Sequence, residues 1–120
     1  MARPKQAADL VFSAVSNPER RKILDMLRGG ERPAGDLVAS FPGLPQPAVS
    51  RHLRILREAG LVDVSPRAQQ RIYVLRPQRL REVDQWVSHY REFWSGRLDS
   101  LEAHLKSAGT RPTSQKGARQ

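Results

Sequence analysis

Cysteine is absent from the 120 residues of this chain. The chain therefore has no disulfide framework, no thiolate metal site and no cysteine nucleophile. No apolar run approaches the roughly 18 residues that cross a membrane, and the first residues lack the apolar core of a signal peptide. We expect a cytoplasmic protein of one domain, without membrane association, whose modest core leaves room for a partner chain.

Catalytic motifs are missing as well. The sequence contains no glycine-rich phosphate loop and no Gly-x-Ser-x-Gly nucleophile motif. Ser50 and His52 are close in sequence, but side chains two positions apart on a helix point in different directions and do not pair. We therefore expect neither an enzyme nor a bound cofactor.

Positive charge is concentrated in one part of the chain. The net charge is +9, and 17 of the 21 basic residues are arginine. Residues 45–79 hold seven arginines against two acids, whereas residues 80–105 have a net charge of −2. A genome rich in G and C accounts equally well for the preference for arginine, but not for its position. This distribution is typical of a nucleic-acid footprint.

Capping and stop signals predict four short helices in the first half of the chain. Asn17 followed by Pro18 is a strong helix start, and Gly29-Gly30 is a helix stop. The last of these helices has an apolar face and an opposite face of polar and basic side chains, Pro47, Ser50, Arg51 and Arg54. The predicted helices cover about residues 9–15, 18–28, 33–39 and 45–59.

Two short β patterns, at residues 61–65 and 71–75, flank a hairpin tip at residues 66–70. The order of helices and hairpin predicts a mainly α fold, a winged helix-turn-helix with four helices and a two-stranded β-wing, over residues 8–76. The ends, residues 1–7 and 107–120, lack periodicity, and we expect a flexible N-terminus and a disordered basic tail.

Apolar residues at alternating three- and four-residue steps predict one long helix over residues 77–106. Its stripe from Leu80 to Leu105 would reach roughly 38 Å, which is longer than a small domain's core can cover. We expect this helix to pair with a second copy, and folding back on its own domain is the alternative. The predicted dimer interface is formed by Val83, Val87, Tyr90, Trp94, Leu98, Leu101 and Leu105.

Two segments, NPERRKIL at residues 17–24 and PAVSRHLRILREAGLV at residues 47–62, resemble the ArsR-type winged-helix repressors of bacteria. The resemblance covers about residues 8–105. It implies a homodimeric repressor whose two recognition helices enter successive major grooves of a palindromic operator in double-stranded DNA. The alternative is a winged-helix module that binds an acidic protein or RNA.

The resemblance also implies which residues contact DNA. Arg51 would bind guanine and Gln46 adenine, Arg54 would meet a phosphate, and the wing would flank the minor groove. His52 is equally suited to a phosphate contact and to a structural hydrogen bond. Tyr73 is better suited to packing within the wing than to a DNA contact. The predicted DNA-binding residues are Gln46, Pro47, Ser50, Arg51, His52, Arg54, Arg67, Gln69, Gln70 and Arg71.

Four departures from the family pattern qualify this resemblance. Pro45 and Pro47 stand where serine or threonine often begins the helix, and the wing tip lacks the frequent glycine. Residues 33–39 lack the cysteine motif of the metal-sensing members, and Asp84 is followed two residues later by tryptophan instead of histidine. We therefore expect no metal site and a place in the non-metal, autorepressor-like branch, with an unknown inducer, either a small molecule or a protein.

Overall fold

The computed structural model describes residues 7–109, without the side chains of residues 97–100, 103 and 106–109. The predicted flexible N-terminus and basic tail lie almost entirely outside the described residues. The chain divides into two compact units, one up to Asp84 and one from Gln85 onward. Within the described residues, no helix is both long enough and apolar enough to cross a membrane.

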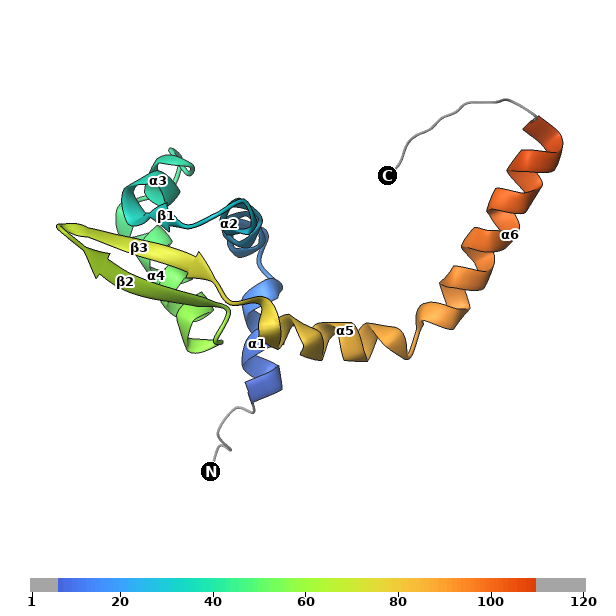
Figure 1. Ribbon diagram of the computed structural model, residues 1–120, viewed down its shortest axis with the longest axis horizontal. Helices are drawn as coiled ribbons and strands as arrows, with labels where there is room; N and C mark the ends of the chain where they lie inside the picture. The colour runs from blue at the N-terminus through green and yellow to red at the C-terminus, as the bar shows by residue number, and fades with distance from the viewer. Residues whose placement is uncertain (1–6, 110–120) are drawn as a thin grey trace. The chain divides into compact units, whose positions relative to one another are not determined.

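The first unit contains four α-helices, α1 (Ala7–Val15), α2 (Pro18–Arg28), α3 (Ala34–Ala39) and α4 (Gln46–Glu58) (Figure 1). The side-chain oxygen of Asn17 accepts a hydrogen bond of 3.0 Å from the backbone N–H of Arg20, so the cap predicted at the start of α2 is formed. The core lies between these helices and the sheet. Its fully buried large side chains are Val11, Ile23, Leu37, Val49, Leu56, Leu61 and Val62.

A small antiparallel sheet joins β1 (Arg32–Pro33), β2 (Val62–Arg67) and β3 (Gln70–Leu75) in the order β1-β3-β2. The predicted two-stranded wing is present as β2 and β3, but the sheet has a third strand that was not predicted, because Arg32 and Pro33 pair with Tyr73 and Ile72 of β3. Two residues carry no alternating pattern, so only this tertiary pairing makes them a strand. In Figure 1 the β2–β3 turn projects beyond the helices.

The wing turn consists of two residues, Ala68 and Gln69, and is shorter than the predicted tip. Ala68 has a φ of +56°. Two-residue hairpin turns need such a positive φ, and a side chain there costs about 1–2 kcal/mol because Cβ crowds the next carbonyl. The absence of glycine from the wing tip therefore leaves a strained turn.

A tight link joins α4 to the wing. Gly60 has a φ of +79°, and its N–H donates to the carbonyl of Arg57 at 3.0 Å. The N–H of Leu61 donates to the carbonyl of Leu56 at 3.0 Å, and its carbonyl accepts from the N–H of Arg76 at 2.7 Å. The first two bonds form a Schellman motif, and the third ties Leu61 to the end of β3.

The long helix predicted over residues 77–106 is interrupted. A 3₁₀ turn, η1 (Pro77–Leu80), is followed by α5 (Arg81–Ser88) and then by α6 (Arg91–Gly109). The Ser88 hydroxyl donates to the Gln85 carbonyl at 2.6 Å, and the N–H groups of His89 and Tyr90 bond to carbonyls three residues back. Such bonds compete with the α-helical pattern, so the predicted continuity was wrong.

Candidate nucleic-acid interface

Helix α4 buries one side and exposes a basic one. Val49, Leu53 and Leu56 are at most 3% exposed, as their spacing predicted. Ser50, Arg51 and Arg54 are exposed. The helix begins without a side-chain cap and has proline in its first turn, where a missing N–H removes no helical hydrogen bond. The unusual start predicted for this helix is therefore compatible with its fold.

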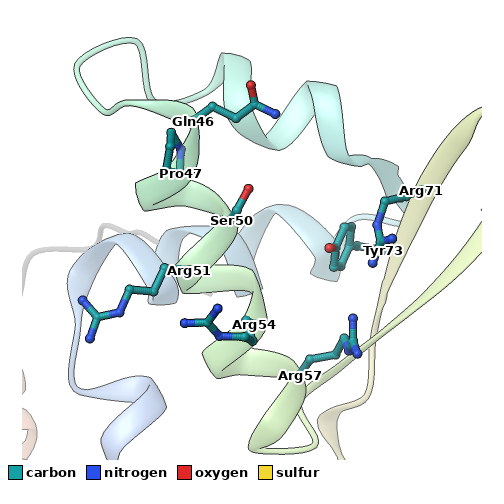
Figure 2. A pocket seen from close by; sticks show the side chains of 8 residues that line it. All are labelled: Gln46, Pro47, Ser50, Arg51, Arg54, Arg57, Arg71 and Tyr73. Atoms are coloured by element: carbon teal, nitrogen blue, oxygen red, sulfur yellow. The ribbon is translucent and has the colours of Figure 1, made fainter.

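The exposed side of α4 and strand β3 enclose an open groove of about 760 Å³. Figure 2 shows its arginines extending from successive turns of α4, with Arg71 entering from the strand. Arg57 and Tyr73 line the groove without having been predicted as contacts. The other lining residues belong to the predicted DNA-binding set, namely Gln46, Pro47, Ser50, Arg51, Arg54 and Arg71.

We call Arg51, Arg54, Arg57 and Arg71 the groove arginines. In the part of the chain that the structure describes, none of the four forms an ion pair within 4.0 Å. The arginines paired with carboxylates, such as Arg67, lie outside the groove. Four uncompensated charges on one concave surface attract a polyanion and concentrate it there.

Tyr73 forms part of both the core and the groove. Its side chain is only 6% exposed, and the residue pairs with Val64 of β2 and with Arg32 of β1. Figure 2 shows its phenol oxygen turned toward α4. Packing within the wing was the prediction, and the structure adds that the same ring lines the groove.

His52 does not line the groove. Its side chain is 15% exposed and lies against α2, with Nδ1 3.1 Å from Arg20 Nη1 and Nε2 3.6 Å from Glu19 Oε1. A guanidinium only donates hydrogen bonds, so Nδ1 accepts and we assign the ring proton to Nε2. Burial and the charge of Arg20 lower the pKa of His52 from 6.5. Of the two roles predicted for His52, this geometry is that of the structural hydrogen bond.

Arg20 connects three helices. Its Nε donates to the carbonyl of Ala14 at 2.8 Å, and its Nη2 donates to the carbonyl of Ser13 at 3.1 Å. Its Nη1 meets His52 on α4. One side chain of α2 therefore binds two carbonyls at the end of α1 and the His52 ring in the middle of α4.

The predicted wing residues lie in two places. Arg67 donates two hydrogen bonds to Glu31, at 2.5 Å and 3.0 Å, which hold the pKa of that carboxyl below its usual range. Gln69 and Gln70 line a second hollow of about 300 Å³ beside Pro33, Ala34 and Gly35, and Arg71 lines both cavities. The wing arginines therefore differ in their partners, since only Arg67 is neutralised.

Comparison with known proteins identifies the family. Residues 17–64 match the family described as bacterial regulatory protein, arsR family. The transcriptional repressor SdpR of Bacillus subtilis is 38% identical over 80 residues, which cover 67% of this chain and 88% of SdpR. The HTH-type transcriptional regulator Rv2034 of Mycobacterium tuberculosis is 30% identical over 104 residues, which cover 87% of this chain and 94% of that protein. The chain belongs to the ArsR family.

The fold agrees with that of solved ArsR-family structures. The crystal structure of the ArsR family transcriptional regulator RHA00566 matches with a TM-score of 0.67, covering 79% of this chain and 97% of that one at 22% sequence identity. This ArsR-family protein is accordingly a DNA-binding transcriptional regulator of mainly helical winged-helix fold. Because regulators of this family are non-enzymatic, the family assignment confirms that the chain is not an enzyme.

Sequence reasoning missed one arginine of the groove in this ArsR-family protein, and it missed two residues outside the groove, Arg20 and Glu31, that contact predicted site residues. Arg57 continues the three-residue spacing of Arg51 and Arg54, so the signal for it was present in the sequence. No local signal was available for Arg20 or Glu31, because their partners lie 32 and 36 positions away. Among the residues described, no three histidine, aspartate or glutamate side chains are grouped to hold a metal ion. The absence of metal regulation stays a prediction.

Proposed function

We propose that this ArsR-family regulator is a homodimeric repressor that binds a palindromic operator. Each protomer places α4 in a major groove and the wing beside the adjoining minor groove. The observation that carries this proposal is the cluster of four groove arginines without an ion pair in the described residues, three on the face of α4 that also presents Gln46 and Ser50 and one, Arg71, on β3. A major groove admits an α-helix, and its base edges suit these side chains.

The residues of the groove divide into those that contact bases and those that contact phosphates. Arg51 binds guanine through two parallel hydrogen bonds, and Gln46 binds adenine in the same way. Arg54, Arg57 and Arg71 contact phosphates, which fix the position of the protein without reading sequence. Gln69 and Gln70, which lie outside the groove of the protein, reach the edge of the minor groove of DNA.

The exposed apolar residues of the second unit support a dimer. Phe93 is 66% exposed, Trp94 45% and Tyr90 49%, and the rings of Tyr90 and Phe93 lie 6.4 Å apart. Leu101 and Leu105 are more than half exposed further along α6. A second copy that covers this surface removes it from water, which favours association by about 25 cal/mol per Å² of apolar area.

The predicted interface changes at its first members. Val83 belongs to the first unit and packs partly against that unit's own core, whereas Val87 in the second unit is half-buried. The side chain of Leu98 lies outside those that the structure describes. The proposed interface is therefore centred on Tyr90, Trp94, Leu101 and Leu105, with Phe93 added.

Duplex binding tests the proposed function directly. A duplex selected from a random pool is titrated with wild-type protein, Arg51→Ala and the charge-matched control Arg28→Ala, whose exposed side chain lies outside the groove. Arg51→Ala is expected to cost about 1–3 kcal/mol of binding free energy, and Arg28→Ala much less. Selection that enriches no sequence, or tighter binding to single-stranded RNA than to any duplex, contradicts the proposal.

Salt provides a second readout of the same complex. If the groove arginines of one protomer neutralise three to four phosphates, the slope of log K against log salt is about −3 per protomer and about −6 for the dimer. A binding constant that does not change with salt contradicts the phosphate contacts.

The dimer has its own test. Phe93→Glu combined with Trp94→Glu places two charges in the proposed interface, and sedimentation is expected to show monomers. Operator binding then weakens strongly, because the two half-sites no longer gain from being linked. A control, Glu92→Gln, changes an exposed residue of the same helix and is expected to leave the dimer intact. An unchanged dimer in the double variant places the interface elsewhere.

A further inference from the structure

The two arginines of the wing have different partners. Arg67 ends β2, and Arg71 is the second residue of β3. Arg71 lines the α4 groove, whereas Arg67 Nη1 and Nη2 donate to the two carboxylate oxygens of Glu31, at 2.5 Å and 3.0 Å. The charge at the end of β2 is therefore cancelled in the free protein, while that at the start of β3 is not.

The sheet determines where Glu31 lies. Glu31 directly precedes β1, and β1 pairs with β3 through Arg32 and Pro33. A carboxylate offers two acceptor oxygens to a guanidinium, and so does a phosphate, so one arginine fork binds either group in the same manner. Glu31 thus occupies the atoms of Arg67 that a DNA phosphate would need.

The Arg67–Glu31 pair is suited to exchange. The side chain of Arg67 is 59% exposed and that of Glu31 is 46% exposed. Water and salt compete with an ion pair at this exposure, so opening it costs little. A duplex supplies a dense row of phosphates in its place. After the exchange, Glu31 faces these phosphates without its cation and repels them.

We propose that Glu31 competes with DNA for Arg67. By binding Arg67 in the free protein, Glu31 lowers the affinity of the wing for the operator. The inference rests on the proposed function. Operator binding replaces the Arg67–Glu31 contact with an Arg67–phosphate contact. Because Arg67 and Glu31 together bring no net charge to the duplex, removing the carboxylate adds one effective positive charge per protomer.

The test compares two substitutions that each remove one negative charge. Glu31→Gln releases Arg67, while the matched control Asp63→Asn removes the other carboxylate paired on this sheet, which accepts a hydrogen bond from Arg76 at 2.6 Å. Fluorescence anisotropy measures binding to the selected duplex across a salt series. Glu31→Gln is expected to bind about two- to fivefold more tightly per protomer. Its slope of log K against log salt is expected to be more negative by about 0.9 per protomer. Asp63→Asn is expected to stay close to wild type in both.

A double-mutant cycle identifies Arg67 as the residue that Glu31 restrains. Arg67→Ala is expected to weaken binding more in the Glu31→Gln background than in wild type. Circular dichroism melts check the fold of each variant, and Glu31→Ala serves as a second variant with the same expected gain. Equal affinities of Glu31→Gln and Asp63→Asn, or an equal loss from Arg67→Ala in both backgrounds, overturn this inference alone. Absence of duplex binding by the wild-type protein overturns the proposed function and the exchange together.

Discussion

Arg20→Ala removes the side chain that connects α1, α2 and α4. Three interactions disappear, with the carbonyls of Ala14 and Ser13 and with Nδ1 of His52, at 2.8, 3.1 and 3.1 Å. A hydrogen bond contributes about 0.5–1.5 kcal/mol net, so their loss is expected to lower the free energy of unfolding by about 2–4 kcal/mol. The partly buried position of all three interactions places this change well above that of an ordinary surface substitution.

Arg21→Ala is the matched control. Arg21 is the next residue of α2, carries the same charge and donates one exposed hydrogen bond of 2.8 Å to the carbonyl of Val15. The two substitutions therefore change helix propensity and net charge equally, and differ in the contacts they remove. Loss of the single exposed bond is expected to cost about 1 kcal/mol or less.

Urea unfolding followed by circular dichroism gives both free energies, and thermal melts give a second measure. For a domain of this size, about 1 kcal/mol shifts Tm by about 4–8 °C, so Arg20→Ala is expected to lower Tm by at least about 8 °C. Removing the charge of Arg20 also lets the pKa of His52 rise, which NMR titration detects. Equal losses of stability in Arg20→Ala and Arg21→Ala would refute the role of Arg20 as a connector.

Four further predictions follow from the same geometry. Because the folded state binds a proton at His52 less readily than the unfolded state, stability is expected to fall as pH decreases below about 6.5, and His52→Gln is expected to reduce this slope in urea unfolding at several pH values. Gly60→Ala, at a φ of +79° and with its Cβ 2.7 Å from Cδ of Arg79, is expected to cost about 1–2 kcal/mol in thermal unfolding. Ala68→Gly is expected to stabilise the wing turn by about 0.5–1 kcal/mol in the same assay, because the relief of strain outweighs the extra backbone entropy that glycine gives the unfolded chain. Micromolar zinc, nickel or cobalt is expected to leave the operator complex intact, and release of the operator at micromolar metal would contradict the prediction that no metal regulates this protein.

The parts of the fold that depend on local signals were predictable from the sequence. Asn17 and Pro18 began α2 where expected, and the apolar spacing of Val49, Leu53 and Leu56 identified the buried side of α4. The strand β1 was not predictable, because Arg32–Pro33 becomes a strand only by pairing with β3. The break between α5 and α6 was missed for another reason, since apolar periodicity continues through Ser88 while its hydroxyl changes the hydrogen bonding.

The candidate site shows the same division. Most of the positions that line the groove from α4 follow from helical geometry, which placed Pro47, Ser50, Arg51 and Arg54 on one exposed face, whereas Gln46 followed from the family resemblance. Helical periodicity does not decide whether a side chain at the boundary between the buried and the exposed face points toward the core or toward solvent. His52 lies at that boundary. Its contact with Arg20, and the contact of Arg67 with Glu31, join segments that are distant in sequence. Contacts of this kind require the three-dimensional fold.

The link at Leu61 has a mechanical consequence. This buried residue is bonded through its N–H to the last turn of α4 and through its carbonyl to Arg76 after β3. A rotation of α4 is therefore expected to move the base of the β2–β3 hairpin with it. The turn at Ala68 and Gln69 lies at the far end of the hairpin, where the strand residues next to the turn are exposed. Any signal that displaces α4 from the major groove of DNA would withdraw the wing in the same movement, so the two proposed contacts with a duplex would be lost together.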